Sequence, residues 1–129
     1  WCWDASPFQV TDETKAMVTN NICYLLNNFL KCSAYENIIF CWVMHEQSII
    51  DSILEKLDTQ NCEVKCVSLI ADENTLRERL SADVEKGTRS EDVIERSIAR
   101  IPMYQALGTI KIDTKGKTVA VIANEIKRL

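Results

Sequence analysis

The chain has 129 residues, of which 47% are hydrophobic and 26% charged, and these values argue against a disordered or repetitive protein. Its formal net charge of −4 argues against non-specific binding to nucleic acid, which needs a dominant basic surface. No apolar run approaches the roughly 20 residues of a membrane-spanning helix, so we expect residues 1–129 to form a single soluble domain.

The first half of the chain predicts two helices and one strand. Thr11 is a suitable N-cap for a helix that ends near residue 32, because apolar residues recur within it at helical spacing. Residues 37–43, NIIFCWV, form a continuous apolar run that is typical of a strand covered on both faces. Residues 48–57 then place their apolar side chains on one stripe of a second helix.

The second half predicts two more strands, at residues 63–71 and 109–113, separated and followed by helices. Asp72, Ser90 and Thr118 are the expected N-caps of these helices. Strands that alternate with helices indicate an α/β fold, with a parallel sheet between two layers of helices. In such a fold ligands bind outside the carboxyl ends of the strands.

The cysteines lie inside apolar segments rather than beside loops, so we expect them to be reduced and mostly buried, as in a cytoplasmic protein. They are Cys2, Cys23, Cys32, Cys41, Cys62 and Cys66. Two of these thiols could bind zinc together with His45, but the spacing matches no zinc pattern. We therefore predict no metal site formed by these residues.

Residues 75–100 contain five arginines: Arg77, Arg79, Arg89, Arg96 and Arg100. On a helix that continues to residue 100, the last three share one face, whereas the first two are about 200° apart and cannot face one site. Acidic residues also precede Arg89 and Arg96 by four positions, the spacing of ordinary ion pairs on a helix surface. Two interpretations therefore stand, a solvated salt-bridged face and a clamp for a polyphosphate.

The order of SLIAD, ENTLRERL, SADVEKGTR and a second arginine-bearing helix resembles the lid region of the P-loop kinases. More narrowly, the chain is similar to the small nucleoside and nucleotide kinase-like group, which includes shikimate and gluconate kinases and antibiotic-resistance and zeta-toxin-like relatives. The resemblance implies an ATP- and Mg²⁺-dependent phosphotransferase with a three-layer sheet. It also implies a lid, at about residues 80–100, that closes over ATP.

The resemblance also implies roles for single residues. Arginines of the lid brace the phosphates, because a planar guanidinium donates two hydrogen bonds to phosphate oxygens. These catalytic arginines are Arg79, Arg89, Arg96 and Arg100.

Two further groups follow from the resemblance. The segment IDTKGK is similar to the loop beside the adenine base, and its candidate residues are Thr114, Lys115 and Lys117. The candidates for the pocket of a small-molecule phosphoryl acceptor are Trp3, Asp4, Phe8 and His45. The alternative for the aromatic members is that they simply cover the sheet.

The Walker A motif of the P-loop kinases, G-x-x-x-x-G-K-[ST], does not occur in residues 1–129. One explanation is that this chain is the C-terminal portion of a kinase, whose first strand and phosphate loop would occupy about forty preceding residues. The other is a non-catalytic module that forms homo-oligomers or binds a ligand. We favour the first, because a sheet without its central strand leaves backbone groups unpaired. On either explanation, we expect the 129 residues alone to be inactive.

Overall fold

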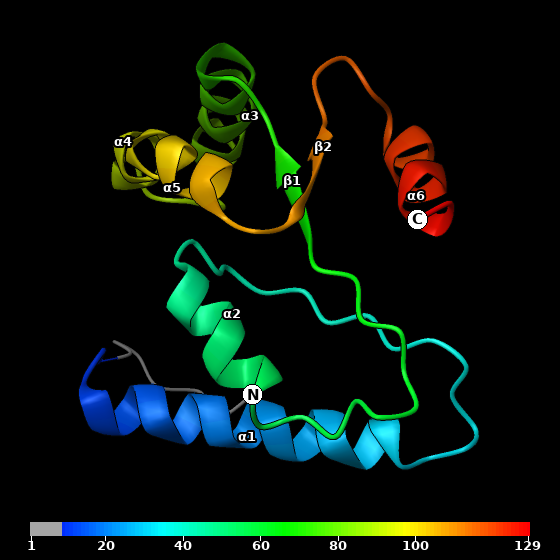
Figure 1. Cartoon of the computed structure of the whole chain (residues 1–129). Coiled ribbons are helices and arrows are strands. Elements are labelled where there is room, and N and C mark those ends of the chain that lie inside the picture. The colour runs from blue at the N-terminus through cyan, green and yellow to red at the C-terminus, as the bar shows by residue number, and fades with distance from the viewer. Residues whose placement is uncertain (1–8) are drawn as a thin grey trace. The chain divides into compact units, whose positions relative to one another are not determined.

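The computed structural model describes residues 9–129, which fall into two compact units (Figure 1). We call the part up to Val64 unit 1 and the part Lys65–Leu129 unit 2. Each unit has its own internal packing and is described separately below. The expectation of a single domain stays a prediction.

Unit 1 is built on helix α1, Asp12–Leu30. Thr11 caps this helix as expected, because its side chain accepts a hydrogen bond from the Thr14 amide at 3.2 Å and its own amide donates to Thr14 Oγ1 at 2.8 Å. Asp12 and Glu13 place negative charge at the positive end of the helix. The predicted start of the first helix is thus confirmed.

The core of unit 1 lies between α1 and helix α2, Gln47–Leu54. Its buried members, which recur at helical spacing on α1 and meet one residue of α2, are Val18, Ile22, Cys23, Leu26 and Ile53. Asn27 fixes the chain after α2, because its side-chain amide donates to the Lys56 carbonyl and accepts from the Asp58 amide, both at 2.9 Å. The predicted apolar stripe of α1 packs in part, because Leu25 and Phe29, which belong to it, are exposed.

Residues 37–43 do not form the predicted strand. Their burial alternates as it would in a strand, with Ile38 and Phe40 packed against the core of unit 1 and Ile39 92% exposed. The segment nevertheless forms no ladder of backbone hydrogen bonds with any strand in the described part of the chain. A strand requires such a partner, and an apolar run alone does not supply one.

Unit 2 contains two parallel strands, β1 (Val67–Ile70) and β2 (Ile110–Asp113). The register pairs Val67 with Ile110 and Ile70 with Asp113, so the carboxyl ends of both strands lie at one edge. Both strands were predicted, with longer bounds. The predicted sheet of three or more strands is not formed by the described residues, whose sheet has two.

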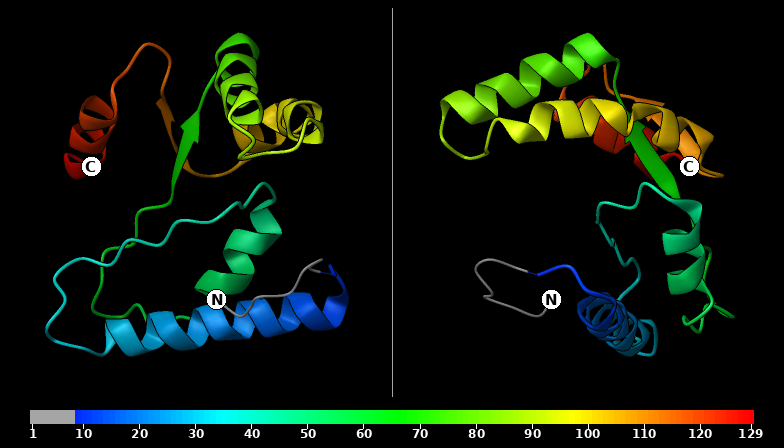
Figure 2. Two further views of the ribbon diagram at one scale, coloured as in Figure 1. Left: turned by 180° about the vertical axis from the view of Figure 1, so that it is seen from behind. Right: turned by 90° about the vertical axis from the view of Figure 1, so that its left-hand side faces the viewer.

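Four helices accompany these strands: α3 (Glu73–Glu85), α4 (Asp92–Ala99), α5 (Ile101–Ala106) and α6 (Val119–Lys127). Figures 1 and 2 show α3, α4 and α5 on the β1 side of the sheet and α6 on the β2 side. Asp72 and Thr118 cap α3 and α6 as expected. The break between α4 and α5 precedes Pro102, which cannot continue the hydrogen-bond ladder of a helix.

The cysteine prediction is half wrong. None of the five described cysteines forms a disulfide, in agreement with the expectation of free thiols. Cys23 is buried, but Cys32, Cys41 and Cys62 are exposed. Cys41 lies on the outward side of the segment that lacks a strand partner, and the other two lie in turns, so apolar neighbours in the sequence did not ensure burial. Within residues 9–129, no helix has both the length and the hydrophobicity needed to cross a bilayer.

Replacing Ile22 with Ala should lower the free energy of unfolding by about 2–5 kcal/mol, because the removed atoms leave a cavity between α1 and α2. Ile22 is fully buried, at 0% exposure. The matched control is Ile39→Ala, which should change the same quantity by less than about 0.5 kcal/mol. Urea denaturation followed by circular dichroism measures both, and equal losses would contradict the placement of the core.

Candidate functional site

The candidate site lies at the edge of unit 2 where β1 and β2 end. The Thr114 amide donates to the Ile70 carbonyl at 2.9 Å, which extends the sheet by one hydrogen bond. The Thr114 hydroxyl donates to the same carbonyl, also at 2.9 Å. Thr114 is only 5% exposed, so the loop that follows β2 begins from a buried and doubly bonded residue.

Arg79 of α3 fixes this loop from the other side. Its Nη1 donates to Thr114 Oγ1 and its Nη2 to the Thr114 carbonyl, each at 2.8 Å. The guanidinium therefore makes a two-pronged contact with one residue, the geometry that arginine otherwise offers to a carboxylate or a phosphate. This contact joins the predicted catalytic residue Arg79 to the predicted cofactor residue Thr114.

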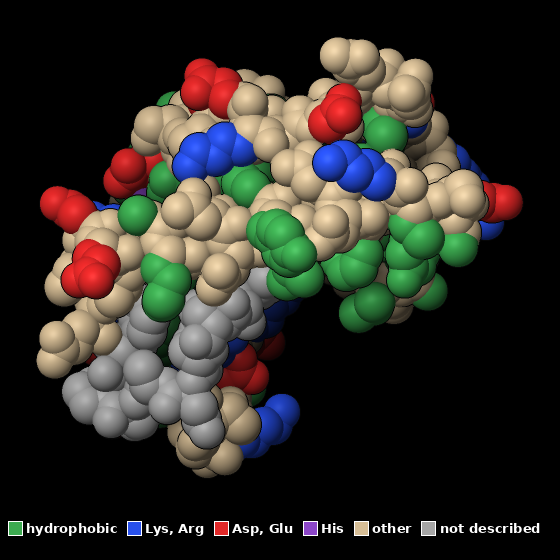
Figure 3. All heavy atoms as spheres, turned by 90° about the horizontal axis from the view of Figure 1, so that it is seen from below, with side chains coloured by type: hydrophobic (Ala, Val, Ile, Leu, Met, Phe, Trp, Pro, Cys, Tyr) green, Lys and Arg blue, Asp and Glu red, His purple; other side chains and the backbone are tan. Residues whose placement is uncertain are grey.

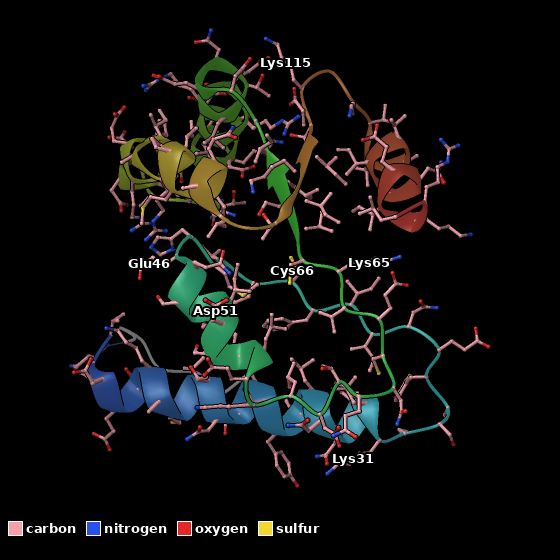
Figure 4. All side chains as sticks on the ribbon, in the orientation of Figure 1. Lys31, Glu46, Asp51, Lys65, Cys66 and Lys115 are labelled. Atoms are coloured by element: carbon pink, nitrogen blue, oxygen red, sulfur yellow. The ribbon has the colours of Figure 1, made fainter. Side chains whose placement is uncertain are left out.

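A second contact joins α3 to the same loop. Lys115, labelled in Figure 4, belongs to the loop that follows β2. Its Nζ lies 2.5 Å from Asp72 Oδ2, while Asp72 Oδ1 accepts a hydrogen bond from the Thr75 amide at 2.8 Å. The hydrogen bond from Lys115, together with that from Thr75, holds the pKa of the Asp72 carboxyl well below its usual range. The same carboxylate raises the pKa of Lys115.

The loop itself is a tight turn. The Lys117 amide donates to the Thr114 carbonyl at 3.3 Å, and Gly116 has a φ of +64°, which an L side chain rarely adopts. Lys117 Nζ contacts Glu125 Oε2 of α6 at 2.8 Å. Contacts to α3 and α6 thus hold residues 114–117 in one shape.

Two of the predicted lid arginines form exposed ion pairs within their own segment. Arg89 Nε lies 3.2 Å from Asp83 Oδ2, and Arg96 Nη1 lies 2.9 Å from Asp92 Oδ2. All four side chains are between 42% and 59% exposed. The pair of Asp92 and Arg96 has the four-residue spacing that the sequence indicated.

The predicted helical face of three arginines is wrong. Helix α4 begins after its N-cap Glu91, and Arg89 precedes it, so only Arg96 of the three lies within the helix. Ser90 does not cap α4, because its hydroxyl bonds to the Asp92 carboxylate instead. Arg100 lies at the junction of α4 and α5. Burial raises the pKa of Tyr104, and the positive charge of Arg100 offsets part of this rise.

Arg77 makes different contacts from Arg79. It contacts Glu73 of its own helix at 3.1 Å and Glu95 of α4 at 2.8 Å, so it joins the two helices. These two carboxylates raise the pKa of the Arg77 guanidinium.

The predicted acceptor residues and the predicted arginines belong to different parts of the chain. Trp3, Asp4 and Phe8 lie outside the described residues. His45 belongs to unit 1, where its Nε2 lies 3.7 Å from Glu46 Oε1 and its buried Nδ1 has no hydrogen-bond partner among residues 9–129. In the described part of the chain, no group of three or more histidine, cysteine or acidic side chains could hold a metal ion.

An open cavity of about 590 Å³ adjoins the carboxyl edge of the sheet. It is formed by residues 70–73, by Asp113 at the end of β2, and by side chains of α4 and α5 that include Ile98, Ile101 and Gln105. The sequence indicated the strand ends here, but nothing in it pointed to Gln105. In the view of Figure 3, the blue side chains of lysine and arginine are separated from one another by other side chains.

The chain was compared with known proteins. Residues 1–100 match the family model that is described as an AAA domain. No curated protein and no solved structure gives a significant match.

The ion pair between Asp72 and Lys115 should make stability depend on pH. The pKa of Asp72 is lower in the folded chain than the value of about 4 expected after unfolding, so its charge stabilises the fold above that pH. The contribution is lost as pH falls below about 4 toward the folded pKa. Asp72→Asn removes the charge but keeps an oxygen that can cap α3.

We expect this variant to unfold at a lower temperature than wild type at pH 7, with the difference shrinking at pH 3. Asp72→Ala, which also removes the cap, should be less stable than Asp72→Asn at both pH values. Glu85→Gln removes a negative charge from the same helix outside this network and serves as the control. A gap between wild type and Asp72→Asn that does not change with pH would contradict the assignment.

Proposed function

Because the chain belongs to the AAA-domain family of P-loop NTPases, we propose that it forms the nucleotide-binding and lid part of an ATP-dependent phosphotransferase. The membership itself indicates a nucleotide-binding, kinase-like P-loop function. The finer proposal is that the γ-phosphoryl group of ATP passes to a nucleoside, a nucleotide or another small metabolite, with Mg²⁺ as the metal of the complete site.

The observation that carries the proposal is the braced loop at the carboxyl edge of the sheet. In parallel α/β sheets this edge is where ligands bind, and here residues 114–117 are tied to β1, α3 and α6. A loop that is already ordered loses little entropy when it binds a flat base. We assign Thr114, Lys115 and Lys117 to the rim of an adenine site on this ground.

The exposed ion pairs of Arg89 and Arg96 are of a kind that a phosphate can displace. A surface ion pair contributes less than about 1 kcal/mol, so exchanging its carboxylate for a phosphate costs little. The released carboxylates, Asp83 and Asp92, stay accessible to water. Phosphate oxygens then accept two parallel hydrogen bonds from each guanidinium, and these hydrogen bonds are stronger than neutral ones. Arg100 is assigned to the same lid by its position.

Fixing the β- and γ-phosphates in line with an acceptor requires backbone amides, a lysine and a Mg²⁺-binding hydroxyl of the Walker A type. Residues 1–129 contain no such motif. We therefore propose that these residues bind ATP without turning it over. Trp3, Asp4, Phe8 and His45 remain the proposed contacts of the phosphoryl acceptor.

A second candidate function, a module that forms homo-oligomers, is favoured by apolar surface in unit 2. Helix α6 has no buried residue, and Val119 is 85% exposed. Leu69 of β1 and Ile110 of β2 are 55% and 43% exposed, although strands of parallel sheets are usually covered on both faces. A second copy could cover these side chains.

ATP affinity of the 129-residue chain tests the first candidate. Arg89→Ala and Arg96→Ala should each weaken ATP binding about tenfold, because each removes charged hydrogen bonds to phosphate. Arg77→Ala is the matched control, since it removes an arginine of the same segment that pairs with Glu73 of α3 and Glu95 of α4. Calorimetric titration at two salt concentrations measures the affinities.

Equal affinity in all four proteins would assign the arginines to an ordinary solvated surface. If wild type binds no ATP and light scattering gives the mass of a dimer, the oligomerising module becomes the better account.

A further inference from the structure

The contact between Arg79 and Thr114 differs in kind from the ion pairs of the other lid arginines. Arg89 and Arg96 bond to exposed carboxylates, which water can solvate after they are released. Arg79 bonds to the hydroxyl and the carbonyl of a residue that is 5% exposed. If Arg79 turned toward a phosphate, the buried Thr114 would lose two hydrogen bonds that water could not easily replace.

The same contact shapes the loop. The Thr114 carbonyl accepts hydrogen bonds from Arg79 and from the Lys117 amide, so Arg79 fixes the group that closes the turn. The Thr114 hydroxyl accepts from Arg79 while it donates to the Ile70 carbonyl. Arg79 therefore connects α3 to the end of β1 and to the turn at 114–117.

Asp72 supplies the second anchor of the loop. Asp72 and Arg79 are seven residues apart, close to two helical turns, so they face the same side of α3 about 10 Å apart. They hold consecutive loop residues, because Asp72 contacts Lys115 and Arg79 contacts Thr114. Two anchors at this separation fix both the position and the direction of the loop.

We infer that Arg79 is a positioning residue, which holds residues 114–117 in the shape that receives the nucleobase, and that it does not contact the phosphates. This inference rests on the proposed nucleotide-binding function and revises the role that the sequence gave to Arg79. On this inference, Arg79 raises the affinity for the base of the nucleotide, and Arg89 and Arg96 contact its phosphates.

Three probes separate the two roles: adenosine, ATP and inorganic tripolyphosphate, each titrated into the full 129-residue chain. We expect Arg79→Ala to weaken the binding of adenosine and of ATP by the same factor, about tenfold, because both ligands need the ordered loop. Its affinity for tripolyphosphate should equal that of wild type. Arg89→Ala should show the opposite pattern, with a lower affinity for tripolyphosphate and an unchanged affinity for adenosine.

Variants of Thr114 test whether Arg79 acts through this residue. Thr114→Ser keeps the hydroxyl and should weaken adenosine binding less than Thr114→Val, which loses one of the two acceptors of Arg79. Combining Thr114→Val with Arg79→Ala should cost less than the sum of the two single variants, because Thr114→Val removes the hydroxyl half of the contact that Arg79→Ala removes whole. Arg79→Lys keeps the charge but cannot make the two-pronged contact, so its affinity for adenosine should lie between those of wild type and Arg79→Ala. This variant replaces Arg79→Ala in the test if the alanine variant does not fold.

Hydrogen exchange of the amides of residues 114–117, measured without any ligand, reports the contact independently of binding. Faster exchange in Arg79→Ala and Arg79→Lys is expected. If Arg79→Ala weakens tripolyphosphate and leaves adenosine unchanged, Arg79 contacts phosphates and the inference is overturned. Wild type that binds neither adenosine nor ATP, with the expected exchange pattern, would instead refute the nucleotide site while the contact itself stands.

Discussion

The buried hydroxyl of Thr114 is the constraint around which unit 2 is arranged. A hydroxyl in a site that is 5% exposed must find partners inside the protein, since an unpaired buried polar group costs about 1–3 kcal/mol. It donates to the Ile70 carbonyl of β1 and accepts from Arg79 of α3. One side chain thereby determines how a strand, a helix and the loop after β2 meet.

The charged residues near Thr114 form two kinds of ion pair, those that hold the loop after β2 and those in the exposed segment between α3 and α4. The bridge between Asp72 and Lys115 and the contact between Lys117 and Glu125 hold the loop on opposite sides. The ion pair of Arg89 with Asp83 lies in the exposed segment between α3 and α4. On the proposed function, a nucleotide would meet a fixed rim at its base and easily exchanged arginines at its phosphates, the combination that a nucleotide site with a movable lid needs.

Local chemistry made much of unit 2 predictable from the sequence. The caps Asp72 and Thr118 and the break before Pro102 follow from interactions within a few residues. The two strands were indicated by their apolar residues, although their pairing joins distant segments. The bond between Arg79 and Thr114 spans 35 residues and depends on how α3 lies against the sheet, which no local pattern encodes. Residues 37–43 failed as a strand for a related reason, because pairing requires a second strand that an apolar run cannot specify.

The central claim is that the loop after β2 is the rim of a nucleotide site. Its most direct test is an NMR titration of the isotopically labelled 129-residue chain with ATP, in which the amide shifts of every assigned residue are followed at about 0.1 M salt. The account predicts that the largest shifts occur at residues 114–117, with further changes at residues 89–96. Shifts confined to unit 1, or shifts in unit 2 that spare residues 114–117, would contradict it.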